Sequence, residues 1–143
     1  LLDPVITGIA DYAVGDRISN LKHMNGMSYW RRLGNWLLRW LTRVSALNFS
    51  ICDPQNGYTV ITREALVRLD LDQIYPRYGY CNDLLVKLSA NQARIKYVQM
   101  PAVYGDEKSK IKYWSYIPGL SKLLLKDFIW RIKVQLFRRQ NNI

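Results

Sequence analysis

The stretch DPQNGY, residues 53–58, follows a basic segment with helical spacing and leads into the β-branched run TVIT at residues 59–62. Its composition favours a turn, because Pro54 presets φ, Asn56 tolerates a left-handed φ and Gly57 adopts one freely. We therefore predict a tight, shaped loop after which a strand begins. Loops of this kind on a rigid scaffold often carry binding or catalytic residues.

A basic amphipathic helix is predicted before this loop, and Ser28 has a side chain suited to its N-cap. Apolar residues recur there every three or four positions, which is the spacing of one helix face. A shorter apolar run at residues 12–15 predicts a buried strand whose end delivers Asp16 and Arg17 to a loop. The apolar helix positions are Tyr29, Trp30, Leu33, Trp36, Leu37, Trp40, Leu41 and Val44.

Strand-like and helix-like segments also alternate after the loop. The length of 143 residues suits one domain with its own core. We therefore expect an α/β fold. The predicted elements are a strand at residues 58–62, a short helix at 63–69, a helix at 82–90 and a strand at 95–100 that Pro101 ends.

From Ile111 onward, apolar residues recur at helical spacing and Lys or Arg residues fill the gaps. The pair Pro118-Gly119 interrupts the pattern, so we predict two basic amphipathic helices within residues 113–143, in the same domain as residues 1–112. Trp, Phe and Leu on the apolar side of a basic helix are typical of a segment in a membrane interface. Packing of that side against the domain is the alternative, and the sequence leaves both open.

The chain is basic, with 21 Lys and Arg against 11 Asp and Glu and a net charge of +10. Residues 17–43 hold six basic residues and no acid, and residues 108–139 hold nine basic residues with Asp127 as the one acid. Clustered positive charge favours a polyanionic partner: a phosphate ligand, an anionic membrane surface or a nucleic acid. No apolar run approaches the roughly 18–20 residues of a membrane-spanning helix.

The cysteine and histidine residues give no sign of a metal centre. Cys52 and Cys81 stand apart, without CxxC spacing and without a cluster of His. We expect two reduced thiols and no structural zinc. The one histidine, His23, lies in a polar stretch and is assigned no role.

Five blocks of residues occur in a fixed order: VGDR at 14–17, MSYWRRLGN at 27–35, DPQNGY at 53–58, GYCNDLL at 79–85 and PAVYGDEKSKI at 101–111. In this order they resemble the family 2 glycosyltransferases, in particular the polyprenyl-phosphate sugar transferases of the dolichyl-phosphate mannose synthase type. The resemblance extends over roughly residues 5–137 of this chain, but only over the second half of the family's catalytic domain.

The resemblance implies the C-terminal, acceptor-side half of a GT-A glycosyltransferase domain, with a mixed sheet flanked by helices and basic amphipathic helices at its end. The half with the nucleotide site and the DxD metal motif is not in the sequence, and the first residue is Leu1. We therefore expect a fragment or a truncated chain that is inactive alone. The complete enzyme is expected to pass a sugar from a nucleotide-diphosphate sugar to a polyprenyl phosphate or another cell-envelope acceptor. It would use Mg²⁺ or Mn²⁺ and lie peripherally on the cytoplasmic face of the cell membrane.

The resemblance also assigns roles to individual residues. Arg17 and Arg31 would cradle the acceptor phosphate, since guanidinium groups bind phosphate in a bidentate fork. Asn35, one turn beyond Arg31 on the same helix face, would assist at a position where the relatives carry Ser. Asp83 would be the catalytic carboxylate, as a base toward a hydroxyl acceptor or as an orienting group toward a phosphate.

Two loops complete the site that the resemblance implies, and no metal ligand is expected in this half. The first would line the acceptor side of the cleft, and the second matches the family's mobile phosphate loop, although Gly105 stands at a longer spacing from Ser109. The cleft residues are Asp53, Gln55, Asn56 and Gly57, and the mobile-loop residues are Lys108, Ser109 and Lys110.

Plainer interpretations of the same residues remain open. Arg31, Arg32 and Arg39 also fit a solvated helix face, and Asp83 fits an acid stabilised by a helix dipole. The alternative function is a non-catalytic basic module that binds a membrane surface or a nucleic acid. The sequence carries no RNP, KH or helix-turn-helix signature, and we expect no nucleic-acid partner.

Overall fold

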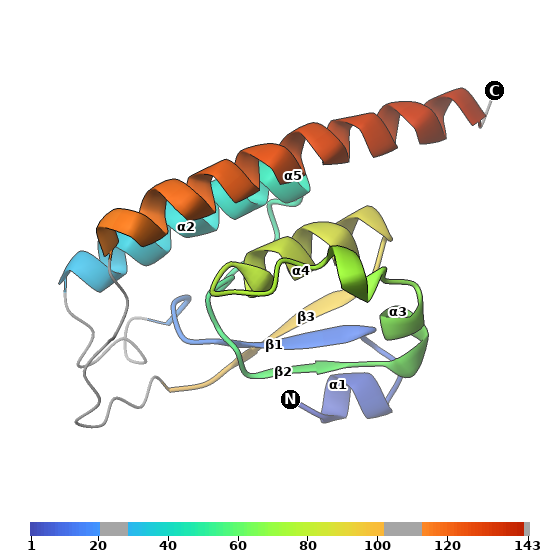
Figure 1. Cartoon of the computed structure of the whole chain (residues 1–143). Coiled ribbons are helices and arrows are strands. Elements are labelled where there is room, and N and C mark those ends of the chain that lie inside the picture. The colour runs from blue at the N-terminus through green and yellow to red at the C-terminus, as the bar shows by residue number, and fades with distance from the viewer. Residues whose placement is uncertain (21–28, 102–112, 142–143) are drawn as a thin grey trace.

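The computed structural model describes residues 1–20, 29–101 and 113–141. These residues form an α/β fold in which helices are layered on a small mixed sheet (Figure 1). The helices are α1 (Asp3–Ile6), α2 (Tyr29–Ala46), α3 (Arg63–Val67), α4 (Tyr80–Ala90) and α5 (Tyr113–Asn141), and a 3₁₀ turn, η2 (Leu71–Gln73), precedes α4.

The sheet has the strand order β2-β1-β3. The central strand β1 (Tyr12–Asp16) pairs antiparallel with β2 (Thr59–Ile61) and parallel with β3 (Ile95–Gln99). All five residues of β1 are buried, as expected for a strand with neighbours on both edges. The predicted mixed sheet flanked by helices is confirmed.

The main apolar core lies between β1 and α4. Tyr12 and Val14 of the strand pack in one buried cluster with Leu85, Val86 and Leu88 of the helix. Complete burial of each aliphatic side chain contributes about 1.5–3 kcal/mol. This core therefore fixes α4 on the sheet.

A second apolar cluster fixes the outer layer of helices. Leu38 of α2 packs with Leu120, Leu123 and Leu124 of α5, and all four are buried. Helices α2 and α5 run side by side beyond α4, and the C-terminal part of α5 projects past the rest of the fold (Figure 1). The carboxyl end of β1 and the N-terminal half of α2 lie at the same side of the molecule (Figure 1).

The elements predicted before residue 101 are confirmed to within two residues at their ends, and only α1 and η2 were not predicted. Ser28, the predicted N-cap of α2, and His23 lie outside the described residues. Cys52 and Cys81 are free thiols as expected, and burial raises the pKa of the Cys81 thiol.

The prediction of two C-terminal helices separated by Pro118-Gly119 is wrong, because α5 is continuous through both residues. Pro118 is the sixth residue of α5, so its missing N–H removes the hydrogen bond to the carbonyl of Trp114 close to the start of the helix. A proline in a helix interior costs about 3 kcal/mol. Burial of Leu120, Leu123 and Leu124 directly after it offsets that cost.

None of the helices in the part of the chain that the structure describes is both long enough and apolar enough to cross a membrane.

Candidate functional site

The candidate site lies at the carboxyl end of β1, where Arg17 and Asp53 form a bidentate ion pair. Arg17 Nε lies 2.8 Å from Asp53 Oδ2 and Nη2 lies 3.1 Å from Oδ1, while the Arg17 backbone N–H donates to Oδ2 at 3.2 Å. The Arg17 side chain is 23% exposed and that of Asp53 is fully buried. Asp53 therefore holds the guanidinium in one orientation at the surface.

The residues beside this ion pair shape the two loops that carry it. Asp16 Oδ1 accepts the backbone N–H groups of Ile18 and Ser19, both at 3.0 Å. Asn56 Nδ2 donates to the carbonyl of Gly15 at 2.8 Å, and its Oδ1 accepts the N–H of Tyr58. Asn56 is 2% exposed, so it joins the loop to β1 from below the surface.

The expectation that a left-handed φ shapes the DPQNGY loop is wrong for both candidate residues. Within the described residues, the positive φ angles belong to Gly8, Leu47 and Gln92. The hydrogen bonds of the Asn56 side chain to the Gly15 carbonyl and from the Tyr58 N–H shape the loop instead. Gly57 is exposed, and a Cβ built there would lie 3.4 Å from the hydroxyl of Tyr80.

A chain of hydrogen bonds, partly buried at Gln55 and fully buried at Thr42, connects the loop to three helices. Gln55 Nε2 donates to Asn82 Oδ1 at 2.6 Å, Asn82 Nδ2 donates to Thr42 Oγ1 at 2.6 Å, and Thr42 donates to the carbonyl of Leu38 at 2.7 Å. The hydroxyl of Tyr116 donates to Gln55 Oε1 at 2.8 Å, and burial raises its pKa to about 12. Tyr116 therefore keeps its proton at neutral pH and remains a donor.

Sequence reasoning did not identify Asn82, Thr42 or Tyr116 as members of this network. Asn82 stands next to Asp83 and Thr42 next to Arg43, so the local sequence carries no signal for either, and the structure shows that each is fully buried. Buried polar side chains require partners, so such positions mark a hydrogen-bond network.

Asp83 lies in the first turn of α4, at the start of the predicted helix, but its carboxylate is not exposed at the rim of a cleft. Its side chain is 1% exposed, and Oδ2 accepts the backbone N–H of Tyr75 at 2.6 Å and the ammonium of Lys87 at 2.8 Å. It is buried because the segment before α4 folds back over it and places the Tyr75 N–H against the carboxylate. Asp83 Oδ1 has no hydrogen-bond partner.

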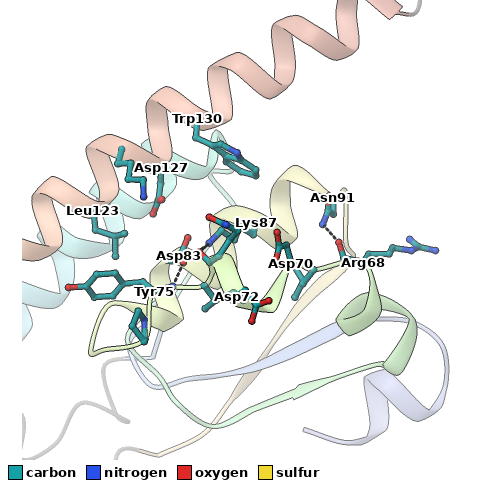
Figure 2. Close-up of a pocket in the computed structure, with 15 residues that line it drawn as sticks. Arg68, Asp70, Asp72, Tyr75, Asp83, Lys87, Asn91, Leu123, Asp127 and Trp130 are labelled. Atoms are coloured by element: carbon teal, nitrogen blue, oxygen red, sulfur yellow. Dashed lines mark hydrogen bonds and ion pairs between the residues drawn. The ribbon is translucent and has the colours of Figure 1, made fainter.

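Asp83 forms part of the wall of a pocket of about 530 Å³ between α4, η2 and α5 (Figure 2). Asp127 reaches the same pocket from α5; it is 6% exposed and its Oδ2 has no hydrogen-bond partner. Burial, and then the charge of Asp83, raises the pKa of Asp127 to about 7. The remaining polar wall residues are Arg68, Asp70, Asp72, Gln73, Lys87, Asn91 and Lys126.

The predicted phosphate-binding residues of α2 are described only in part. Arg31 belongs to α2, but its side chain lies outside the described residues; Asn35, one turn later, is half-buried. Lys108, Ser109 and Lys110 of the mobile loop also lie outside them. The structure thus brings together Arg17, Asp53, Gln55 and Asn56 at the end of β1, and places Asp83 on the side of α4 that faces α5.

No group of three or more His, Cys, Asp or Glu side chains that could hold a metal ion occurs among the described residues. Asp16, the acid nearest the ion pair in sequence, already accepts two backbone N–H groups.

The chain is distantly similar to two curated archaeal proteins. It is 27% identical over 106 residues to a UDP-N-acetylglucosamine–dolichyl-phosphate N-acetylglucosaminyltransferase of Methanococcus voltae, a match that covers 74% of this chain and 42% of the relative. It is 24% identical over 132 residues to the uncharacterized protein MJ1222 of Methanocaldococcus jannaschii, with 92% of this chain and 53% of that protein covered. The chain thus spans about half the length of the relatives it matches. No family model and no solved structure matches the chain.

The first of these similarities supports a relationship to glycosyltransferases of the family 2 kind. The small mixed sheet with its helices is compatible with part of such a domain.

Proposed function

We propose that the protein is the acceptor-side part of a GT-A glycosyltransferase that passes a sugar from a nucleotide-diphosphate sugar to a lipid phosphate such as polyprenyl phosphate. The observation that carries the proposal is the Arg17–Asp53 ion pair at the carboxyl end of β1. The distant similarity to a dolichyl-phosphate N-acetylglucosaminyltransferase supports it. In open α/β sheets, ligands bind at the carboxyl ends of the strands.

The chemistry needs a fixed cation more than it needs a base. A lipid phosphate is already an anionic nucleophile, and a guanidinium held in one orientation binds it without first losing side-chain freedom. Asp53 supplies that fixed orientation to Arg17 through two side-chain hydrogen bonds. Arg31, Asn35, Lys108 and Lys110 are the proposed further phosphate ligands.

Asp83 is proposed to organise the site instead of removing a proton. Its carboxylate is buried and already accepts the ammonium of Lys87 and the N–H of Tyr75. Its neighbour Asn82 holds Gln55 of the DPQNGY loop. Through α4, the two residues therefore couple the loop to the interior of the fold.

The donor half of the reaction requires groups beyond this chain. Mg²⁺ or Mn²⁺ is proposed for the complete enzyme, where it would neutralise the diphosphate leaving group. Without that metal and its acidic ligands, the chain alone is proposed to be inactive.

A membrane surface is the proposed location, on its cytoplasmic face. Helix α2 exposes an apolar stripe: Trp30 is 77% exposed, Trp36 56%, and Leu33 and Leu37 43% each. Arg32 on α2 and Lys122 and Lys133 on α5 are exposed on the same pair of helices. Aromatic and basic residues together favour the headgroup layer of an anionic membrane.

The experiment that tests the proposal is sugar transfer by the full-length gene product. Radiolabelled UDP-N-acetylglucosamine, UDP-glucose and GDP-mannose are each offered with dolichyl phosphate in phosphatidylcholine vesicles and Mg²⁺ or Mn²⁺, and the lipid fraction is counted. We expect one donor to label the lipid phosphate. Label on a hydroxyl acceptor but not on dolichyl phosphate would contradict the proposed acceptor class. No label with any of the donors would contradict the proposed reaction.

A further inference from the structure

Arg39 and Arg43 stand one turn apart on α2. They continue the series of polar residues spaced by four that begins with Arg31 and Asn35. Both side chains are half-buried. They lie on the flank of α2 next to its buried face, which carries Thr42. A solvated helix face was the plainer interpretation of Arg39 in the sequence, and its partial burial differs from that interpretation.

Arg39 is left with an unmet hydrogen-bond donor. Its Nε is buried and has no hydrogen-bond partner, and Arg39 belongs to none of the ion pairs found between two described residues, which join Arg17 to Asp53, Lys87 to Asp83 and Arg94 to Asp11. A guanidinium does not lose its proton in a protein. A buried charged donor without an acceptor is rare in folded proteins, so an acceptor is expected at this position.

Arg43 brings a second positive charge to the same place. Its Nε donates to the carbonyl of Ile51 at 2.7 Å, and its guanidinium carbon lies 5.4 Å from the centre of the Trp40 ring. Burial, and then the charge of Arg39, lowers the pKa of Arg43. Like charges one turn apart on a helix repel each other, and an anion between them would remove that repulsion.

The location of the pair points to the ligand. Arg43 of α2 donates to the carbonyl of Ile51, and two residues later Asp53 accepts from Arg17, which directly follows β1. Two guanidinium groups, from different elements, thus hold residues 51 and 53. We propose that Arg39 and Arg43 form an anion site that takes a phosphate group beside the Arg17–Asp53 pair. The site rests on the proposed function only in the choice of phosphate over other anions.

Thermal unfolding with inorganic phosphate as the probe tests the site, at constant ionic strength set with chloride. A ligand that binds the native state raises Tm. We expect phosphate to raise Tm of the parent and of Arg63→Gln, which loses an exposed arginine on α3. The phosphate effect should disappear in Arg39→Gln and shrink in Arg39→Lys, because Lys keeps the charge but loses the planar fork.

Arg39→Gln should also unfold at the same or a higher temperature than the parent in phosphate-free buffer, since it removes an unmet charged donor. This makes loss of binding distinguishable from loss of fold. Equal phosphate effects in the parent and Arg39→Gln, or no phosphate effect in the parent, would overturn the site.

Two further probes distinguish the two possible sources of the phosphate group. UDP represents the donor diphosphate, and dolichyl phosphate in phosphatidylcholine vesicles represents the lipid headgroup. A dissociation constant raised about tenfold by Arg39→Gln is expected for one of them, the size of a lost charge-assisted hydrogen bond. Unchanged affinity for both would overturn the proposal. These measurements need no turnover. If the protein shows no transferase activity but still binds phosphate through Arg39, the proposed function is wrong and the anion site stands.

Discussion

Asp83 on α4 and Asp127 on α5 line the same pocket, and each carries one carboxylate oxygen without a hydrogen-bond partner. The groups around Asp127 are the carboxylate of Asp83 and the ammonium groups of Lys87 and Lys126. The raised pKa of Asp127, about 7, follows from burial and from the neighbouring carboxylate. Packing of α5 against α4 therefore favours the protonated form of the Asp127 carboxyl.

The stability of the fold should decrease as pH rises from about 4 to about 7. The native state binds a proton at Asp127 in this window, between the ordinary pKa of 3.8 and the raised value of about 7, whereas the unfolded chain has released it. In Asp127→Asn this contribution to the pH dependence should disappear, and the variant should be more stable than the parent at pH 8. Urea unfolding at a series of pH values measures both effects.

Asp72→Asn is the matched control for that experiment, since Asp72 lines the same pocket but is exposed. It should keep the pH slope of the parent. A slope in Asp127→Asn equal to that of the parent would show that the Asp83–Asp127 pair is not the cause.

Gly15→Ala should lower the free energy of unfolding by about 1–3 kcal/mol, as overpacking of a filled site does. A Cβ at Gly15 would collide with Met100 Sδ and would lie 2.6 Å from Asn56 Nδ2, the atom that holds the loop to β1. Gly34→Ala is the opposite case, because Gly34 lies inside α2 and a built Cβ there meets no atom within 4 Å apart from its chain neighbours and the backbone of its own helix. It should stabilise the protein by roughly 0.5–1 kcal/mol. Destabilisation of both variants by similar amounts would contradict this explanation.

Asn82→Ala should destabilise the protein by about 1–3 kcal/mol, because it leaves Gln55 and Thr42 with unmet polar groups in the interior. Asn91→Ala, which removes one exposed hydrogen bond to the carbonyl of Arg68, should change the free energy of unfolding by less than about 0.5 kcal/mol. Equilibrium urea unfolding of the two variants gives the comparison. If the two losses are equal, the network does not bind the loop to the helices.

Membrane binding should depend on the exposed face of α2. The parent is expected to sediment with vesicles of phosphatidylcholine and phosphatidylglycerol and to be released by salt, because salt screens surface charges. The double change Trp30→Ser and Trp36→Ser should weaken binding about tenfold or more, since it removes two exposed rings from one stripe. Ile6→Ser with Val67→Ser changes two residues, each 75% exposed, on other helices and should have little effect. Equal sedimentation of the two double variants would rule out α2 as the contacting surface.

The apolar residues at helical spacing in α2, such as Trp30 and Trp36, are mostly exposed, and the buried face of the helix carries Leu38 instead. Periodicity was nevertheless sufficient to predict this helix. It was not sufficient at Pro118, where the local preference of one residue was outweighed by Leu120, Leu123 and Leu124 packing against α2. That packing depends on residues some 80 positions earlier in the chain, which no local pattern contains.

The candidate site was predictable to a smaller extent. The turn residues of DPQNGY and the end of the first strand placed Asp53 and Arg17 in loops, but their pairing arises only when the sheet brings residues 36 positions apart together. The burial of Asp83 could not be read from its position at a helix start, since it depends on the fold of the segment around Tyr75. Arg39 is likewise ordinary in sequence, and only its buried Nε sets it apart.

The most direct test of the central claim is the kcat/KM of the full-length gene product for dolichyl phosphate when the Arg17–Asp53 pair is replaced as a unit. The double variant Arg17→Gln, Asp53→Asn leaves no unpaired buried charge, and its matched control is Arg94→Gln, Asp11→Asn, which removes the exposed ion pair of 2.7 Å at the opposite end of β1. We predict that kcat/KM for the lipid phosphate falls by about tenfold or more in the first variant and by less than about twofold in the second, in keeping with a charge-assisted phosphate contact. Equal values in the two variants would contradict the claim that this pair binds the acceptor phosphate.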